Sequence, residues 1–296
     1  MKRPEEIIRR RMSFEQLQRG FDSLPADLLV NGQTASLALA SAVLRAFMDA
    51  DWVERHVVSD GRKKGFLSID DSDPYRREMS FFRVMDLAEV IYNLQPVPGF
   101  DECITRIREG DIEGTYAELD FGRMLYLNKV PFRFVVPQGT IGLDYDIEIE
   151  CPNGTIASAD AKCKIEGTDF GENTIENTLK KARKQLPDSM PGIVFVKVPP
   201  RWIGDPNSVA SMLRVARSFL RKTRRVVSVK FYSSPITLSN NVLRHDHAYK
   251  EVSNPSTDFG DDVDWNIFKK HILPPEMNGM PAHWRRIIFF PDGKPR

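Results

Sequence analysis

Two consecutive segments in the middle of the chain alternate polar and apolar residues with a period of two. The first, Asp144–Ile149, alternates three acids with Tyr and Ile. The second, Ile156–Lys164, alternates small residues with the polar set Ser158, Asp160, Lys162 and Lys164. Because successive side chains of a strand point to opposite faces, both patterns predict strands with one polar face. These strands constrain the fold strongly, because they must pair across the short segment between them.

The connection between the two strands is the sequence CPNGT at 151–155. A three-residue loop, with Gly154 in the left-handed conformation, pairs Asp146 with Asp160. A tight two-residue Asn-Gly turn places the two acids on opposite faces instead. We predict the three-residue loop, which brings both carboxylates and Lys162 onto one face.

The surrounding segments predict an α/β fold. Apolar periodicity indicates a helix, three strands, a helix, a strand, a helix and a strand, a succession typical of a central mixed sheet flanked by helices. The expected ranges, in the same order, are 112–128, 132–136, 143–151, 155–164, 172–186, 192–198, 207–224 and 226–232.

The chain divides into three regions by its pattern. Residues 1–110 are rich in helical periodicity, notably at 33–53 and 78–95, and form a helical N-terminal region. Residues 111–235 form the α/β core. Residues 236–296, with several prolines, are expected to be an irregular C-terminal extension packed on that core.

Composition narrows the function classes. No apolar run approaches the ~20 residues that a membrane crossing needs. Three cysteines without a CxxC pair indicate neither a disulfide framework nor a zinc site, so a cytoplasmic protein is expected. The net charge of +1 hides an uneven distribution: residues 101–120 hold seven acids against two arginines, and residues 201–230 hold eight Lys and Arg against one acid.

Glu118 is a candidate third acid. In the helix expected at 112–128 it stacks with Gly122 and Leu125, on the side that faces the sheet. An unpaired carboxylate there is costly. It is either satisfied by an arginine, such as Arg123 or Arg133, or belongs to a metal site, and we favour the metal site.

Two or three carboxylates beside a lysine suit a magnesium-dependent hydrolase. Mg²⁺ prefers oxygen ligands and keeps several waters, so few carboxylates suffice. A metal polarises a phosphate oxygen and activates water, and a lysine stabilises developing charge. The alternative is the solvent-facing side of an antiparallel hairpin, where acids and lysines are common.

These segments, in this order, resemble the PD-(D/E)XK nuclease superfamily, in which a helix glutamate, a strand aspartate and a D/E-x-K strand converge on one or two divalent metals. The matching stretches are YAEL at 116–119, VPF at 130–132, DYDI at 144–147 and ADAK at 159–162. The resemblance covers roughly residues 112–200 and implies a restriction-endonuclease-like core.

The resemblance assigns the catalytic positions to Glu118, Asp146, Asp160 and Lys162, with Asp146, Asp160 and Glu118 as metal ligands. Gln185 resembles the helix glutamine of recombination-type members. The sequence departs from the family pattern in two respects, since Tyr145 precedes Asp146 where Pro is usual and the same run offers Asp144 as a second acid. Asp144 competes as a ligand, but the hydrophobic–acidic–hydrophobic residues after Asp146 favour the latter.

The helix expected at 207–224 has a basic outer face, formed by Arg214, Arg217, Arg221 and Arg224. Such a face neutralises phosphates without reading sequence. A solvated helix surface has the same pattern.

Together these features predict a Mg²⁺-dependent phosphodiesterase or endonuclease, with Mn²⁺ as a substitute metal and nucleic acid, DNA before RNA, as substrate. No membrane association is expected, and a homodimer is compatible with the sequence. The alternative is a catalytically inactive nuclease-fold module that binds nucleic acid or a protein partner.

Overall fold

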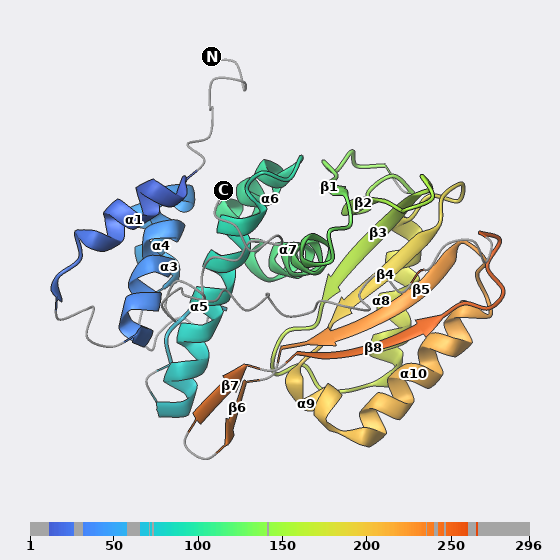
Figure 1. Ribbon diagram of the computed structural model, residues 1–296. Helices are drawn as coiled ribbons and strands as arrows, with labels where there is room; N and C mark the ends of the chain where they lie inside the picture. Colours follow the sequence, from blue (N-terminus) through green and yellow to red (C-terminus); the bar gives the residue numbers. More distant parts are fainter. Residues whose placement is uncertain are drawn as a thin grey trace. The chain divides into compact units, whose positions relative to one another are not determined.

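The computed structural model describes residues 12–26, 32–57, 66–70, 72, 74–140, 142–234, 236–239, 242–245, 247–259 and 265. These residues form two compact units (Figure 1). The first contains the described residues up to Pro96, and the second begins at Val97. Every residue of the predicted catalytic set lies in the second unit.

The first unit is helical. Its helices are α1 (Phe14–Asp22), α3 (Gly32–Met48), α4 (Ala50–His56) and α5 (Pro74–Leu94). At the start of α1, the Ser13 hydroxyl accepts from the Gln16 N–H while the Gln16 side chain accepts from the Ser13 N–H, which satisfies two otherwise unpaired donors. Helices α3 and α5 pack together through buried aliphatic residues. No helix in the described part of the chain has the length and hydrophobicity that a membrane crossing requires.

The second unit contains a six-stranded mixed sheet in the order β1-β2-β3-β4-β5-β8. Strand β2 is antiparallel to both of its neighbours, β1 and β3. Strands β3, β4 and β5 are parallel, and β8 is antiparallel to β5. The strands are β1 (Phe132–Phe134), β2 (Ile147–Glu150), β3 (Ile156–Cys163), β4 (Gly192–Lys197), β5 (Val226–Ser233) and β8 (Ala248–Ser253). A separate hairpin consists of β6 (Ile236–Ser239) and β7 (Val242–His245).

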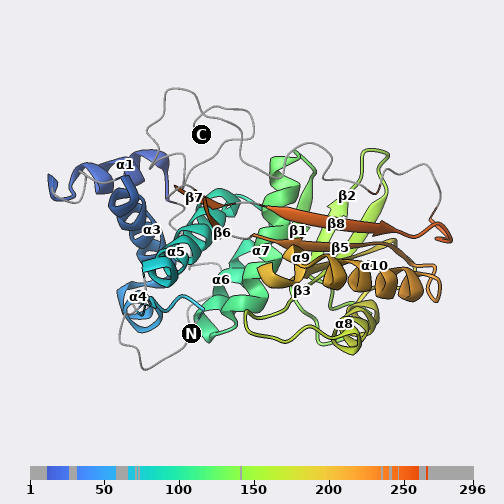
Figure 2. The ribbon, with the colours of Figure 1, turned by 90° about the horizontal axis from the view of Figure 1, so that it is seen from below.

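Helices flank the sheet. They are α6 (Phe100–Glu109), α7 (Ile112–Leu127), α8 (Glu172–Gln185), α9 (Pro200–Gly204) and α10 (Pro206–Leu220). One face of the sheet packs on α7, where Phe121 stacks on Phe195 of β4 with 4.7 Å between ring centroids. The other face carries Val194 and Val196, which pack with α8 and α10 in one apolar core (Figure 2). The predicted α/β class and the order of elements are confirmed.

The loop between β2 and β3 has the predicted three residues. The Cys151 N–H donates to the Thr155 carbonyl at 2.8 Å, and Gly154 has a φ of 81°. The ladder continues through Ile149 opposite Ala157 and ends at Ile147 opposite Ala159. This register turns Asp160 and Lys162 toward the face that carries Val194 and Val196, because those residues are their neighbours in β4.

Two segments differ from the expectation. Helix α10 ends at Leu220 rather than near residue 224, so Arg221 caps it and Arg224 lies in the turn before β5. Residues 248–253, expected to be irregular, form β8, because their backbone groups complete the open edge of β5.

Gly99 makes a close contact that positions α6. It has a φ of 81°, and a Cβ on it would lie 2.1 Å from the Phe134 carbonyl oxygen. Replacement by Ala therefore combines backbone strain with overlap, and we expect Gly99→Ala to lower the free energy of unfolding by about 3 kcal/mol.

Gly110 is the matched control, because its φ is 107° but a Cβ there meets nothing within 4 Å. Gly110→Ala should cost only the backbone term, about 1 kcal/mol. Urea denaturation of both variants makes the comparison. Equal losses would show that the Gly99–Phe134 approach has no energetic consequence.

Candidate functional site

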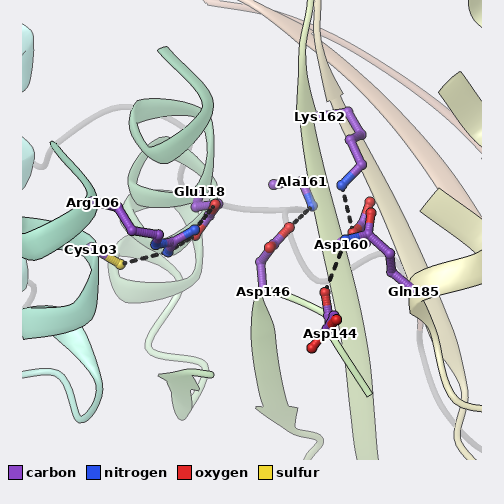
Figure 3. Close-up of polar contacts among 9 residues, drawn as sticks. All are labelled: Cys103, Arg106, Glu118, Asp144, Asp146, Asp160, Ala161, Lys162 and Gln185. Carbon is purple, nitrogen blue, oxygen red and sulfur yellow. Dashed lines mark hydrogen bonds and ion pairs between the residues drawn. The ribbon is translucent and has the colours of Figure 1, made fainter. Parts of the chain in front are cut away.

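Asp146 is held where β2 separates from β3. Its N–H donates to the Ala159 carbonyl at 2.9 Å, and its Oδ2 accepts from the Ala161 N–H at 2.7 Å. Figure 3 shows the carboxylate directed at the β3 backbone. The residue as a whole is half-buried.

Asp160 occupies the neighbouring position on β3 and is completely buried. Its Oδ1 accepts from the Lys162 Nζ at 2.7 Å, since the two side chains lie two residues apart on one strand face. Its Oδ2 is also buried, yet it has no hydrogen-bond partner among the residues that the structure describes. Native proteins rarely leave such an oxygen unmatched, because its desolvation is costly. Among the described residues of the site, Asp160 Oδ2 is the one buried carboxylate oxygen without a hydrogen bond, although the Arg106 Nε also lacks one.

The electrostatics of the site reflect two carboxylates sharing one lysine. Burial and the repulsion from Asp146 raise the pKa of Asp160 well above its ordinary value, against the opposing effect of Lys162. Burial also raises the pKa of Asp146. Burial alone lowers the pKa of Lys162, but Asp160 and Asp146 outweigh it and the net shift is upward. One lysine therefore does not offset the cost of ionising both carboxylates in this buried position.

Glu118 is engaged by an arginine that the sequence analysis did not identify. Its two carboxylate oxygens accept from Arg106 of α6, at 2.7 and 2.5 Å, and both side chains are largely buried. Burial and the Asp146 charge raise the pKa of Glu118 to about 8, although Arg106 lowers it. Figure 3 shows Glu118 turned toward Arg106 and away from the Asp160–Lys162 pair.

The arginines considered as partners of Glu118 bind elsewhere. Arg123 pairs with Asp120, and Arg133 makes two hydrogen bonds to Glu148, at 2.9 and 2.8 Å. The only sequence signal for Arg106 is its location in the acid-rich stretch 101–120. Its separation of 12 residues from Glu118 spans two helices, which helical spacing does not relate.

Gln185 and Asp144 stabilise the segment before β2, at the edge of the site. The Gln185 Nε2 donates to the Asp144 carbonyl at 3.2 Å, which ties the end of α8 to the segment before β2. The Asp144 carboxylate accepts from the Gln138 N–H at 2.8 Å and so closes its own loop. The preference for Asp146 over Asp144 as a metal ligand stays a prediction.

The four arginines predicted to bind phosphate do not join the carboxylates. Arg214 pairs with Glu172 of α8, and Arg224 pairs with Asp258 at 3.1 Å. Arg217 and Arg221 are exposed at the end of α10. Two of the four charges are therefore already neutralised within the protein.

A second buried charged group lies on the α7 face of the sheet. Asp120 is completely buried and pairs with Arg123 at 2.6 Å and with Lys197 of β4. Arg123 also donates to the Tyr232 hydroxyl at 2.9 Å, and that hydroxyl contacts the His247 ring. Burial would raise the pKa of Asp120, but its two cations dominate and lower it. Because its charges are paired, this network ties α7 to β4 and β5.

Comparison with protein-family models, curated proteins and solved structures found no match to this chain. Within the described ranges, no group of three or more His, Cys, Asp or Glu side chains is arranged to hold a metal ion. What the second unit offers is a pair of carboxylates, Asp146 and Asp160, with Lys162 beside them and Glu118 held back by Arg106. Function must be inferred from that arrangement.

The Asp160 Oδ2 has no hydrogen-bond partner among the described residues. We therefore expect the folded protein to become more stable when the charge of Asp160 is removed. An acid whose pKa is raised by folding keeps an extra proton in the folded state, so stability falls as pH rises from its unfolded value, about 3.9, through its folded value. Without metal, Asp160→Asn should therefore increase the free energy of unfolding at pH 8, and increase it less at pH 5.

Chemical denaturation in EDTA at both pH values measures this gain. Asp144→Asn is the control, since an Asn oxygen still accepts from the Gln138 N–H. An Asp160→Asn protein that is less stable than wild type at pH 8 would identify Asp160 as a structural partner of Lys162.

Proposed function

We propose that the second unit is a metal-dependent nuclease of the PD-(D/E)XK type, which hydrolyses phosphodiester bonds in nucleic acid, with DNA as the first-choice substrate. The observation that carries this proposal is the buried Asp160 Oδ2, which lacks a hydrogen-bond partner among the described residues and lies beside a second carboxylate and a lysine. The order α7-β1-β2-β3-α8-β4 supports it, because a restriction-endonuclease-like core is expected to have this order.

The residues present fit Mg²⁺, and equally Mn²⁺. A hard cation takes carboxylate oxygens and keeps several waters, so Asp146 and Asp160 provide enough protein ligands. A cation there would match the Asp160 oxygen and offset the repulsion that raises the pKa of Asp160. The buried Asp120 differs because a cation lies beside each of its oxygens, although its Oδ1 also makes no hydrogen bond.

Each side chain then has a distinct task. The bound metal would polarise a phosphate oxygen and lower the pKa of a water molecule. Asp146 and Asp160 hold it, and Gln185 keeps the segment before Asp146 in place. Lys162 is protonated at neutral pH because its carboxylate neighbours raise its pKa. It therefore donates to the phosphate and stabilises its developing charge, and does not act as a base.

The runner-up function is a nuclease-fold module that binds nucleic acid or a protein partner without turnover. The Arg106–Glu118 pair favours it, because Arg106 occupies both oxygens of the third expected ligand. In the catalytic proposal, Glu118 contributes through its charge near Asp146 or through a water molecule. The catalytic proposal requires that Asp146 and Asp160 bind the metal without Glu118 as a ligand, whereas the binding module requires no metal ligand.

Cleavage assays distinguish the two functions. Linear, circular and single-stranded DNA and an RNA are incubated with the full chain in Mg²⁺, Mn²⁺ or EDTA. We expect DNA cleavage only with metal, and a loss of at least about a hundredfold for Lys162→Ala, because one charge-stabilising donor is removed. Asp160→Asn should abolish cleavage, because it removes a metal ligand.

Asp144→Asn is the matched control and should cleave like wild type. Nucleic-acid binding without cleavage in every condition would favour the binding module. Cleavage that persists in Asp160→Asn would contradict the assignment of the site. Cleavage of RNA but not of DNA would support the proposed hydrolysis of phosphodiester bonds and identify RNA as the substrate.

A further inference from the structure

The polar face of β3 continues beyond the catalytic lysine. The Lys164 N–H donates to the Lys197 carbonyl at 2.8 Å, so the extended backbone persists one residue past the end of β3. Asp160, Lys162 and Lys164 therefore follow one another along one face, at intervals of about 6.6 Å. Lys164 is partly buried.

Helix α8 brings another lysine to the same end of that face. Its Leu179 and Ala182 pack with Val194 and Val196, the β4 neighbours of Asp160 and Lys162. Because α8 connects two parallel strands, it runs opposite to β3. Lys181, one turn before Gln185, therefore lies farther along in the direction from Lys162 to Lys164.

The three lysines are close enough to affect one another. Burial comes first among the causes that lower the pKa of Lys164, followed by repulsion from Lys181 and then from Lys162. A partly buried cation beside two like charges is unfavourable unless an anion accompanies it.

Neither Lys164 nor Lys181 has an ion-pair partner within the described part of the chain. The buried Lys197 and Lys230 each have a carboxylate, and even the exposed Lys180, next to Lys181 in α8, pairs with Glu176. Lys129, Lys184, Lys222 and Lys250 also have no ion pair within the described part of this unit. Lys164 and Lys181 differ from them because Lys164 is partly buried and both lie near the Asp160–Lys162 face of β3, close enough for Lys181 to lower the pKa of Lys164.

We propose that Lys164 and Lys181 bind the phosphate next to the one that is hydrolysed, so that the nucleic-acid strand runs along β3 from Asp160 toward Lys164. This inference rests on the proposed nuclease function. Lysines act here as point charges that position the backbone without reading sequence. They replace the α10 arginines as the predicted phosphate contact, because Arg214 and Arg224 are already paired.

The test is equilibrium binding of fluorescently labelled duplex DNA to the full chain in EDTA, over a series of salt concentrations. The double variant Lys164→Gln, Lys181→Gln should bind about tenfold more weakly, whatever the DNA sequence, and the slope of log affinity against log salt should fall by about 1.8. Its melting temperature should not fall, because repelling charges have been removed.

Two controls separate a local contact from general attraction. Lys180→Gln should bind like wild type. Arg217→Gln, Arg221→Gln removes the same charge from α10 and should weaken binding less than the lysine pair. Equal effects of the two double variants, or a lower melting temperature for the lysine variant, would overturn the inference.

The proposed function and this inference fail differently. A wild-type protein that neither binds nor cleaves nucleic acid overturns both. A wild-type protein that binds and cleaves DNA, with unchanged affinity in the lysine variant, overturns only the phosphate contact.

Discussion

The pairing of β2 with β3 is the constraint on which the rest of the site depends. The three-residue loop that ends at Gly154 places Ile149 opposite Ala157, and a slip of one residue would turn every side chain of β3 to the other face. In the observed register the alanines of β3 face α7 while Asp160 shares a face with Val194. The same register ends at Ile147, which frees Asp146 to bind the Ala161 N–H with its side chain.

The second unit contains two buried acids with opposite electrostatic situations. Asp120 has a cation on each oxygen and its pKa is lowered, so burying it serves the packing of α7 on the sheet. Asp160 has one lysine for two neighbouring carboxylates, and its pKa is raised. A buried ion pair with a purely structural role is destabilised when one of its charges lacks a partner. A binding site, by contrast, keeps a charge that its ligand neutralises. This contrast within one fold is why Asp160, and not Asp120, is the candidate for chemistry.

Sequence patterns predicted the features that depend on residues close together in the chain, but few of the features that depend on tertiary packing. The hairpin register followed from the length of one loop, and the order of helices and strands followed from periodicity. Arg106 was missed because it lies on a different helix from Glu118, and the partners of a charge depend on how helices pack. Strand β8 was missed because Lys250 and Glu251 interrupt its apolar pattern, and only the open edge of β5 explains it. The end of α10 was misplaced by a few residues, as helix ends often are.

Counting charges shows what the Arg106–Glu118 pair does for the site. The pKa values of Glu118 and Asp160 are raised in the absence of a cation, and a bound cation would favour their ionised forms. With all five groups ionised, Asp146, Asp160 and Glu118 oppose Lys162 and Arg106, which leaves one negative charge. A divalent cation changes that balance to one positive charge, which a single phosphodiester neutralises. Without Arg106 the same cation would only cancel the carboxylates, and the phosphate would bring an uncompensated negative charge into a buried site. Arg106 is thus compatible with the proposed function: it withdraws Glu118 from the proposed metal ligands, but with a divalent cation bound the site would have the charge that a phosphate group needs.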